Sequence, residues 1–179
     1  MDVFETIKTR RSIRRYEEKP VREKSLLKVL EAARLAPSAD NCQPWSFIVV
    51  TDLGVKKGLV SAYKERWKDW LISAPVIIVA CAFPEKAYVR DDGEEYWMVD
   101  VAIAMQDLVL TAWGEGLGTC WIGNFNEEKV KRVLEIPPNV RVVAMTPLGY
   151  PAEDKGAVTN RKPLEEIVHY DRWRPNIVN

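Results

Sequence analysis

Between residues 94 and 113 the chain carries more apolar side chains than a helix at a protein surface can accommodate. The apolar positions recur at helical spacing, at Trp97, Val101, Ala104, Met105, Leu108 and Ala112. A helix that is apolar around most of its circumference has to be enclosed by other elements. We therefore expect a central helix here, with the rest of the chain folded around it.

Uninterrupted apolar runs predict the strands of a sheet beside this helix. They cover residues 45–50, 76–83 and 140–145, and we expect the first to be buried on both faces. A shorter strand is expected over residues 119–122, after the glycines that end the central helix and before Gly123. The sheet therefore draws on segments from the whole chain.

Further helices are expected between these strands. Asp2 followed by Glu5 is a capping box, which predicts a first helix that ends near Arg10. Others are expected over residues 23–35 and 55–70, and Asn126 caps one that ends at Leu134. The inward side chains expected for the two middle helices are Leu26, Leu27, Leu30, Ala33, Leu59, Tyr63, Trp67 and Trp70.

The order of these elements predicts an α+β fold, with a central mixed sheet flanked by helices, because helices and strands do not alternate strictly. Residues 1–179 show no repeat and no linker, so we expect one domain. The last thirty or so residues contain Pro151, Gly156, Pro163 and Pro175, which is typical of an extended arm. Seven tryptophans exceed the needs of so small a core, and some are expected at an aromatic ligand or a subunit interface.

Charge and cysteine usage exclude several classes of protein. Lys and Arg number 26 and Asp and Glu also 26, which argues against a generally basic nucleic-acid binder. The uncharged stretch over residues 71–84 is interrupted by Pro75 and is too short to span a membrane. The first ten residues have no apolar core of the kind that a secretory signal requires, so we expect no export by that route. Cys42, Cys81 and Cys120 are too far apart for a disulfide framework. We expect a cytoplasmic protein with no nucleic-acid or membrane partner.

Several common kinds of active site lack support. His169 is the only histidine, and no nucleophile stands beside a predicted base, so a hydrolytic triad is disfavoured. The acidic cluster at residues 91–95 is best interpreted as a solvated loop, and no metal site is predicted. The glycines at 114–118 follow a helix, whereas a dinucleotide fingerprint links a strand to a helix. We therefore assign neither a catalytic side chain nor a metal ligand.

A cationic segment directly after the first helix is the first feature that could bind a ligand. Arg10, Arg11, Ser12, Arg14 and Arg15 can converge on an anion, and guanidinium groups and a hydroxyl suit a phosphate monoester. The alternative is that these cations offset the helix dipole and face water.

The loop over residues 37–44 is the second such feature. It places Ser38, Asn41 and Gln43 between a helix end and a strand, where their side chains could bond the polar edge of a ligand. The alternative is ordinary turn chemistry.

Four blocks of the sequence, in order, resemble the signature of a known family. They are Arg10-Arg11-Ser12-Ile13-Arg14, the stretch from Ala36-Pro37-Ser38 through Asn41-Cys42-Gln43-Pro44-Trp45, Gly116-Leu117-Gly118-Thr119-Cys120-Trp121-Ile122-Gly123, and Asn160-Arg161-Lys162-Pro163-Leu164. Together they resemble the FMN-dependent nitroreductase family and extend over most of the chain.

The resemblance implies an α+β homodimer with FMN at each of two interface sites. NADH or NADPH would reduce the flavin, and a small aromatic acceptor such as a nitroaromatic, a quinone or a free flavin would reoxidise it in a ping-pong cycle. Other FMN chemistry on the same fold, oxygen-dependent or dehalogenating, and a non-catalytic flavin-binding protein are the alternatives. The flavin would carry the chemistry, so the resemblance requires no catalytic side chain.

The resemblance also implies roles for particular residues. Arg10, Ser12 and Arg161 would hold the FMN phosphate with Arg11 nearby, and Arg14 would approach the pyrimidine edge. The turn at Ile122, Gly123 and Asn124 would sit against the central ring and point one backbone N–H at the nitrogen that takes up hydride. The remaining cofactor-binding candidates are Pro37, Ser38 and Ala39, which would act from the partner subunit, and Asn41, Gln43 and Trp121.

Two positions depart from the family pattern. Ala39 stands where many members have a second serine, and Thr159 where a lysine often precedes the phosphate-binding arginine. We expect Lys162 or Arg11 to replace the missing charge.

Overall fold

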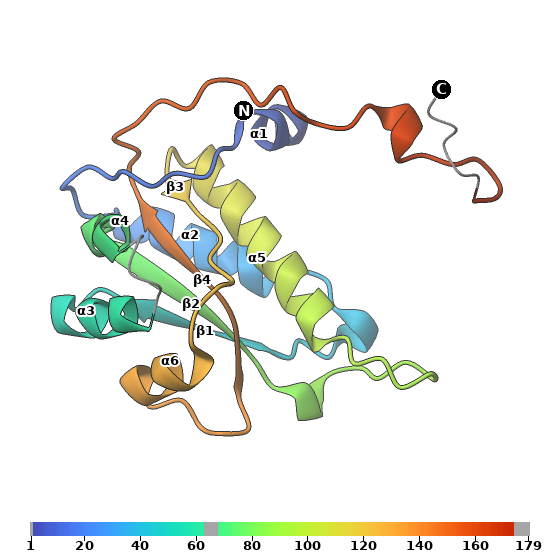
Figure 1. The fold of residues 1–179 in the computed structure, drawn as a ribbon, viewed down its shortest axis with the longest axis horizontal. Coiled ribbons are helices and arrows are strands. Elements are labelled where there is room, and N and C mark those ends of the chain that lie inside the picture. The colour runs from blue at the N-terminus through green and yellow to red at the C-terminus, as the bar shows by residue number, and fades with distance from the viewer. Residues whose placement is uncertain (1, 63–67, 174–179) are drawn as a thin grey trace.

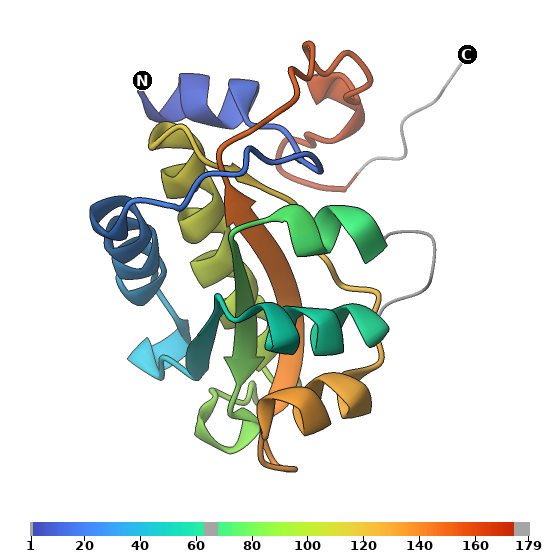
Figure 2. The same cartoon turned by 90° about the vertical axis from the view of Figure 1, so that its left-hand side faces the viewer.

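The computed structural model describes residues 2–62 and 68–173, which form a sheet covered by helices on both faces (Figures 1 and 2). The strands are β1 (Trp45–Val50), β2 (Val76–Ala82), β3 (Gly118–Thr119) and β4 (Arg141–Gly149), in the order β1-β2-β4-β3. Helices α2 (Glu23–Arg34) and α5 (Trp97–Gly114) cover one face. The other is covered by α3 (Leu53–Ser61), α4 (Lys68–Ser73) and α6 (Glu127–Leu134). This architecture confirms the α+β class.

Strand β2 lies at the centre of the molecule and separates two apolar cores. Ile78 and Ala80 point to the core beneath α2 and α5, whereas Ile77, Val79 and Cys81 point to the core beneath α3, α4 and α6. Successive side chains of a strand point to opposite faces, so an unbroken apolar run is what burial on both faces requires. Every residue of β2 is buried, as expected for a central strand.

The central helix and two helix starts are confirmed. Eight side chains of α5 are buried, and Met105 and Leu108 are completely enclosed. In α1 (Val3–Thr9) the Asp2 side chain accepts a hydrogen bond from the N–H of Glu5 at 2.8 Å. Asn126 caps α6 in the same way through the N–H of Lys129, at 2.9 Å. Local capping chemistry therefore located these helices correctly.

Two expectations about burial were wrong. Strand β1 is an edge strand with Val49 36% exposed, because no strand of the sheet pairs with its outer side. In α2, Leu27 is 58% exposed and Val29 is buried in its place, because α5 packs against the helix face that carries Val29 and Ala33. Apolar character alone does not say which side of a sheet or helix finds a neighbour.

Several boundaries also differ from expectation. In place of one helix over 55–70, α3 ends at Ser61 and α4 begins at Lys68, and Tyr63 and Trp67 lie outside the described residues. Strand β3 has two residues, with an isolated bridge from Ile122 to Met145 beyond it, and β4 continues to Gly149. All pairings between these strands are antiparallel. The parallel part of the expected mixed sheet is a single bridge between Ser12 and Thr119, because only that short segment runs along β3 in the same direction.

The C-terminal arm is confirmed over its described residues, 151–173. It leaves the sheet at the end of β4 and carries mostly exposed side chains and a short 3-10 turn, η4 (Leu164–Glu166) (Figure 1). Two other 3-10 turns are η1 (Ala39–Asn41) and η3 (Pro84–Lys86). Among the described residues, no helix combines the length and the apolar character needed to cross a bilayer.

Candidate functional site

The cationic segment at residues 10–15 runs alongside β3. The N–H of Ile13 donates to the carbonyl of Thr119 at 2.8 Å, and Ser12 forms the bridge with the same residue. Ile13 is 1% exposed and sits directly over Gly118, where a Cβ atom would lie only 2.6 Å from its side chain. Because alternate residues of an extended segment point to opposite sides, this burial of Ile13 turns Ser12 and Arg14 away from the core.

The start of the C-terminal arm lies along the other side of this segment. Arg11 donates through Nε to the carbonyl of Gly156 at 2.7 Å, and Tyr16 bridges to Pro151. The carboxylate of Glu153 accepts from the N–H of Arg14 at 2.7 Å. These contacts join residues about 140 positions apart and bring the arm that carries Arg161 to the cationic segment.

Arg10, Arg11 and Arg161 form a cluster of like charges. Burial lowers the pKa of the Arg10 guanidinium, and the positive charges of Arg11 and Arg161 lower it further. Within residues 2–62 and 68–173, neither Arg10 nor Arg161 forms an ion pair. Guanidinium groups that repel one another and have no protein anion between them fit a phosphate, whose charge would relieve the repulsion.

The segment that follows β3, residues 120–126, is hydrogen-bonded to the rest of the fold at both ends and has exposed residues between them. The N–H of Cys120 donates to Oγ1 of Thr146 at 3.1 Å, and Ile122 exchanges two main-chain hydrogen bonds with Met145. Ile122 is 2% exposed, whereas Trp121, Gly123 and Asn124 are exposed. The N–H of Ile122 is therefore committed to the sheet, and the expected donor to a ring nitrogen narrows to the N–H of Gly123 or Asn124.

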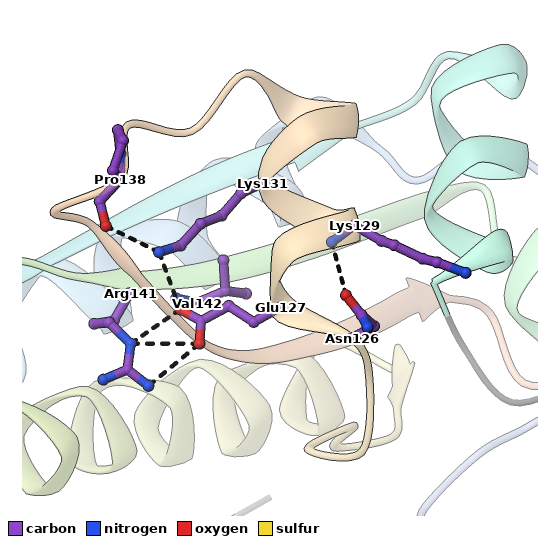
Figure 3. A network of polar contacts seen from close by, with 7 residues as sticks. All are labelled: Asn126, Glu127, Lys129, Lys131, Pro138, Arg141 and Val142. Atoms are coloured by element: carbon purple, nitrogen blue, oxygen red, sulfur yellow. Dashed lines mark hydrogen bonds and ion pairs between the residues drawn. The ribbon is translucent and has the colours of Figure 1, made fainter.

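The far end of this segment is anchored by the start of α6 (Figure 3). The N–H of Asn126 donates to the carbonyl of Ala62 at 2.9 Å. The Glu127 carboxylate accepts from Arg141 at 3.0 Å and from the N–H of Val142 at 2.9 Å, and pairs with Lys131 at 3.5 Å. Its exposed fraction is 25%, so these bonds are only partly screened by water.

The loop at residues 37–43 lies elsewhere, next to the first turn of α5. The N–H of Ala39 donates to Oδ1 of Asp100 at 2.9 Å, whereas Arg10 follows Thr9, whose hydroxyl accepts from Trp113 near the end of α5. From residue 100 to residue 113 an α-helix rises by about 20 Å. One chain therefore brings three of its four signature blocks together. The remaining block, which contains Pro37, Ser38 and Ala39, lies at the opposite end of α5.

The same loop has an unusual backbone. Asp40, Asn41 and Gln43 have positive φ angles, a conformation that costs energy in residues other than glycine. Ser38 Oγ accepts from the N–H of Gln43 at 2.9 Å, and the Gln43 amide donates to Asn41 at 3.1 Å. The side chains of Asn41 and Gln43 thus form turn contacts with one another here, and a contact with a ligand stays a prediction.

The sequence reasoning missed three residues that hold these parts in place. Asp100 is 1% exposed, and its signal was readable, because it is a carboxylate on the same stripe of the central helix as Trp97 and Ala104. Trp70 was expected only as an inward side chain of a helix, and nothing local indicated that its ring would lie 6.0 Å from the Arg14 guanidinium. Glu153 had no local signal. Their roles depend on contacts between distant parts of the chain.

Comparisons with known proteins show which family and fold this chain resembles. A relative from Methanothermobacter thermautotrophicus, named NADH dehydrogenase/NAD(P)H nitroreductase, is 37% identical over 97% of this chain and 88% of its own length. The crystal structure of a nitroreductase family protein from Clostridium novyi NT is 42% identical, with a TM-score of 0.81 over 86% of this chain and 87% of that one. An FMN-dependent nitroreductase from Clostridium difficile R20291 is 31% identical, with a TM-score of 0.82 over 94% and 98% of the two chains.

The family model described as "Nitroreductase family" matches residues 7–68 and 53–150, which is most of the chain. The matched residues include the cationic segment, the loop at 37–43, α5 and the segment after β3. Family match, fold and clustered signature blocks agree, and the chain belongs to the nitroreductase family.

Proposed function

We propose that the protein is an FMN-dependent oxidoreductase that takes hydride from NADH or NADPH and reduces nitroaromatic, quinone or flavin-type acceptors. The observation that carries this proposal is the cluster of Arg10, Arg11 and Arg161, which no protein anion neutralises within the described residues. The cationic segment runs along β3, and the exposed residues Gly123 and Asn124 lie in the segment that follows β3. A phosphate site and a polar main-chain edge on neighbouring segments suit a flavin mononucleotide. The relative from Clostridium difficile, named as FMN-dependent, supports the same cofactor.

The proposed roles follow from these positions. Arg10, Ser12 and Arg161 would bind the phosphate through guanidinium and hydroxyl donors, with Arg11 nearby. Arg14 would lie near the pyrimidine, where a cation stabilises negative charge, and the N–H of Gly123 or Asn124 would add a fixed dipole. Trp121, which is exposed on the same segment, would also contact the cofactor.

We propose a homodimer in which the loop at 37–43 completes the site of the second copy. Its position near Asp100, at the far end of α5 from the cationic segment, supports this arrangement. So do the apolar side chains that the isolated chain leaves in water. They include Val3, Phe4 and Ile7 on α1, at 73%, 72% and 52% exposed, and Leu164, Ile167, Tyr170 and Trp173 on the arm. Apolar surface of this extent is typical of a subunit interface.

FMN supplies hydride and electron transfer when it is bound. The chain itself would hold the phosphate of FMN and would stabilise negative charge on the flavin with Arg14 and a main-chain N–H. It would leave one face of the flavin ring open to both substrates in turn. We expect several planar acceptors to react, because a site without a demanding set of buried polar groups discriminates weakly between ligands. We also propose a cytoplasmic location, because Cys42, Cys81 and Cys120 are all free thiols.

An absorption spectrum of the purified protein tests the proposed cofactor. We expect a flavin spectrum that bleaches when NADH or NADPH is added without oxygen. A flavin spectrum that does not bleach would indicate a binding protein rather than a reductase. A colourless protein that also fails to bind added FMN would contradict the proposal entirely.

Steady-state kinetics test the single shared site. Initial rates at varied donor and acceptor should give parallel double-reciprocal lines, because the donor product leaves before the acceptor binds. Intersecting lines would mean that both substrates bind together and that a second site exists.

A further inference from the structure

Glu153 is a carboxylate of the arm that lies against the main chain of the cationic segment, at Arg14. Its side chain is 13% exposed. One carboxylate oxygen accepts from the N–H of Arg14 at 2.7 Å, and the other pairs with Lys155 at 3.1 Å. The N–H of the neighbouring Ala152 donates to the carbonyl of Arg15 at 2.9 Å. The main chain of Arg14 and Arg15 is therefore held by hydrogen bonds to the arm on both sides of the peptide that joins them.

Arg14 is restrained at the end of its side chain as well. Its guanidinium lies 6.0 Å from the centre of the Trp70 ring, within range of a cation–π contact. Glu153 fixes the main chain from which the Arg14 side chain extends, and Trp70 favours one direction for the Arg14 guanidinium. An exposed arginine has many rotamers, so two restraints of this kind remove much of its freedom before any ligand arrives.

We propose that Glu153 is a positioning residue for the flavin site, which acts through the main-chain N–H of Arg14 to direct the Arg14 guanidinium. This inference rests on the proposed function, because Arg14 matters only if a ligand lies beside it. A carboxylate suits the role because it accepts hydrogen bonds without donating any. Burial alone would raise the pKa of Glu153, but the N–H of Arg14 and the Lys155 ammonium lower it, so the group stays ionised at neutral pH.

The ion pair with Lys155 offers a competing explanation for any effect of Glu153. Lys155 is 41% exposed, and ion pairs at the surface contribute little. We therefore expect the hydrogen bond to Arg14, rather than the ion pair, to control binding. Replacing Lys155 alone separates the two contributions.

The test is FMN binding by full-length protein from which flavin has been removed, followed by fluorescence quenching. Glu153→Ala should weaken binding about tenfold, as expected for loss of a hydrogen bond to a charged group. Glu153→Gln, which keeps an oxygen acceptor, should stay within about threefold of the unaltered protein. Lys155→Ala and the matched control Asp154→Ala, an exposed carboxylate one residue away, should change binding less than about twofold. Glu153→Met, which also lacks the acceptor, replaces Glu153→Ala if that variant does not fold.

A double-mutant cycle with Arg14→Ala distinguishes positioning from a general structural role. If Glu153 acts through the guanidinium, Arg14→Ala weakens binding and Glu153→Ala adds little to that loss. Additive losses, an unaffected Arg14→Ala variant, or a Gln variant as weak as the Ala variant would overturn the inference. Failure of the unaltered protein to bind FMN would instead overturn the proposed function, so the two failures are distinguishable.

Discussion

Arg10 and Arg161 lie far apart in the sequence, and the fold places their like charges beside each other. If they hold the FMN phosphate, Arg161→Ala and Arg10→Ala should each weaken FMN binding by about 1.5–3 kcal/mol, the range for hydrogen bonds to charged groups. Titration of flavin-free protein with FMN measures the change. Arg172→Ala, an exposed arginine on the same arm, is the control and should bind normally. Unchanged affinity in both test variants would contradict the phosphate assignment.

The three thiols differ in how much of each side chain water can reach. Burial raises the pKa of Cys81 to about 11, and burial also raises the pKa of Cys120, whereas Cys42 is half-buried in the loop at 37–43. Only a thiolate attacks a disulfide reagent. At pH 8 we expect one thiol per chain to react quickly and three after unfolding. Cys42→Ser should remove the fast reaction, and rapid modification that persists in this variant would show that a buried thiol is accessible.

At the scale of elements, the contact between the cationic segment and β3 depends on Gly118. A Cβ there would lie 2.6–2.9 Å from three atoms of Ile13, including its Cβ, so rotation of the Ile13 side chain cannot remove the clash. Gly118→Ala should lower the free energy of unfolding by about 1–3 kcal/mol and weaken FMN binding by displacing the segment. Urea unfolding and FMN titration measure the two effects.

Gly156→Ala is the matched control, because no atom lies within 4 Å of the added Cβ. It should change stability by less than about 0.5 kcal/mol. Equal losses of stability in the Gly118→Ala and Gly156→Ala variants would mean that the close approach of Ile13 is not the reason why residue 118 is a glycine.

Glu127 links α6 to β4, and its contribution to stability should depend on pH. Burial alone would raise its pKa, but the hydrogen bonds from Arg141 and Val142 outweigh that effect and lower it. Because the folded pKa lies below the unfolded value of about 4.3, the stabilisation is complete above that value. It is lost as the pH falls through the folded pKa.

Glu127→Gln should therefore cost about 1.5–3 kcal/mol at pH 7 and distinctly less at about pH 3. Urea unfolding at the two pH values measures this difference, with the exposed neighbour Glu128→Gln as the control. A cost that is the same at both pH values would show that the ionised carboxylate is not the stabilising group.

At the scale of the whole molecule, the proposed site combines the cationic segment of one chain with the loop of another. Arg10→Ala and a bulky Ala39→Trp should each impair flavin binding as homodimers. A mixed dimer of the two variants should recover one intact site of its two, because both defects fall in the other site. Co-expression with two affinity tags and measurement of bound FMN per dimer tests this.

Mixed dimers without any recovery would place both groups of residues in a site within one chain. Light scattering on the unaltered protein supplies the companion measurement. A stable monomer that retains flavin would contradict the proposed homodimer, whatever the mixed dimers show.

The sequence alone predicted features that depend on neighbouring residues. The apolar circumference of α5, the caps Asp2 and Asn126, and the unbroken apolar run of β2 were all readable, because helical periodicity, capping and burial leave marks within a few residues. The ordered signature blocks led to the nitroreductase family for the same reason, since each block is a short local pattern.

Only the tertiary structure decided which of these pieces meet. It placed β1 at an edge, turned Leu27 outward, joined Glu153 to Arg14 across 139 residues, and set the loop at 37–43 against Asp100. An apolar run does not say whether a strand will have one neighbour or two, and a lone carboxylate does not say which N–H it will accept from. Those outcomes depend on how all the layers pack together, because contacts between distant segments form only when the whole core is closed.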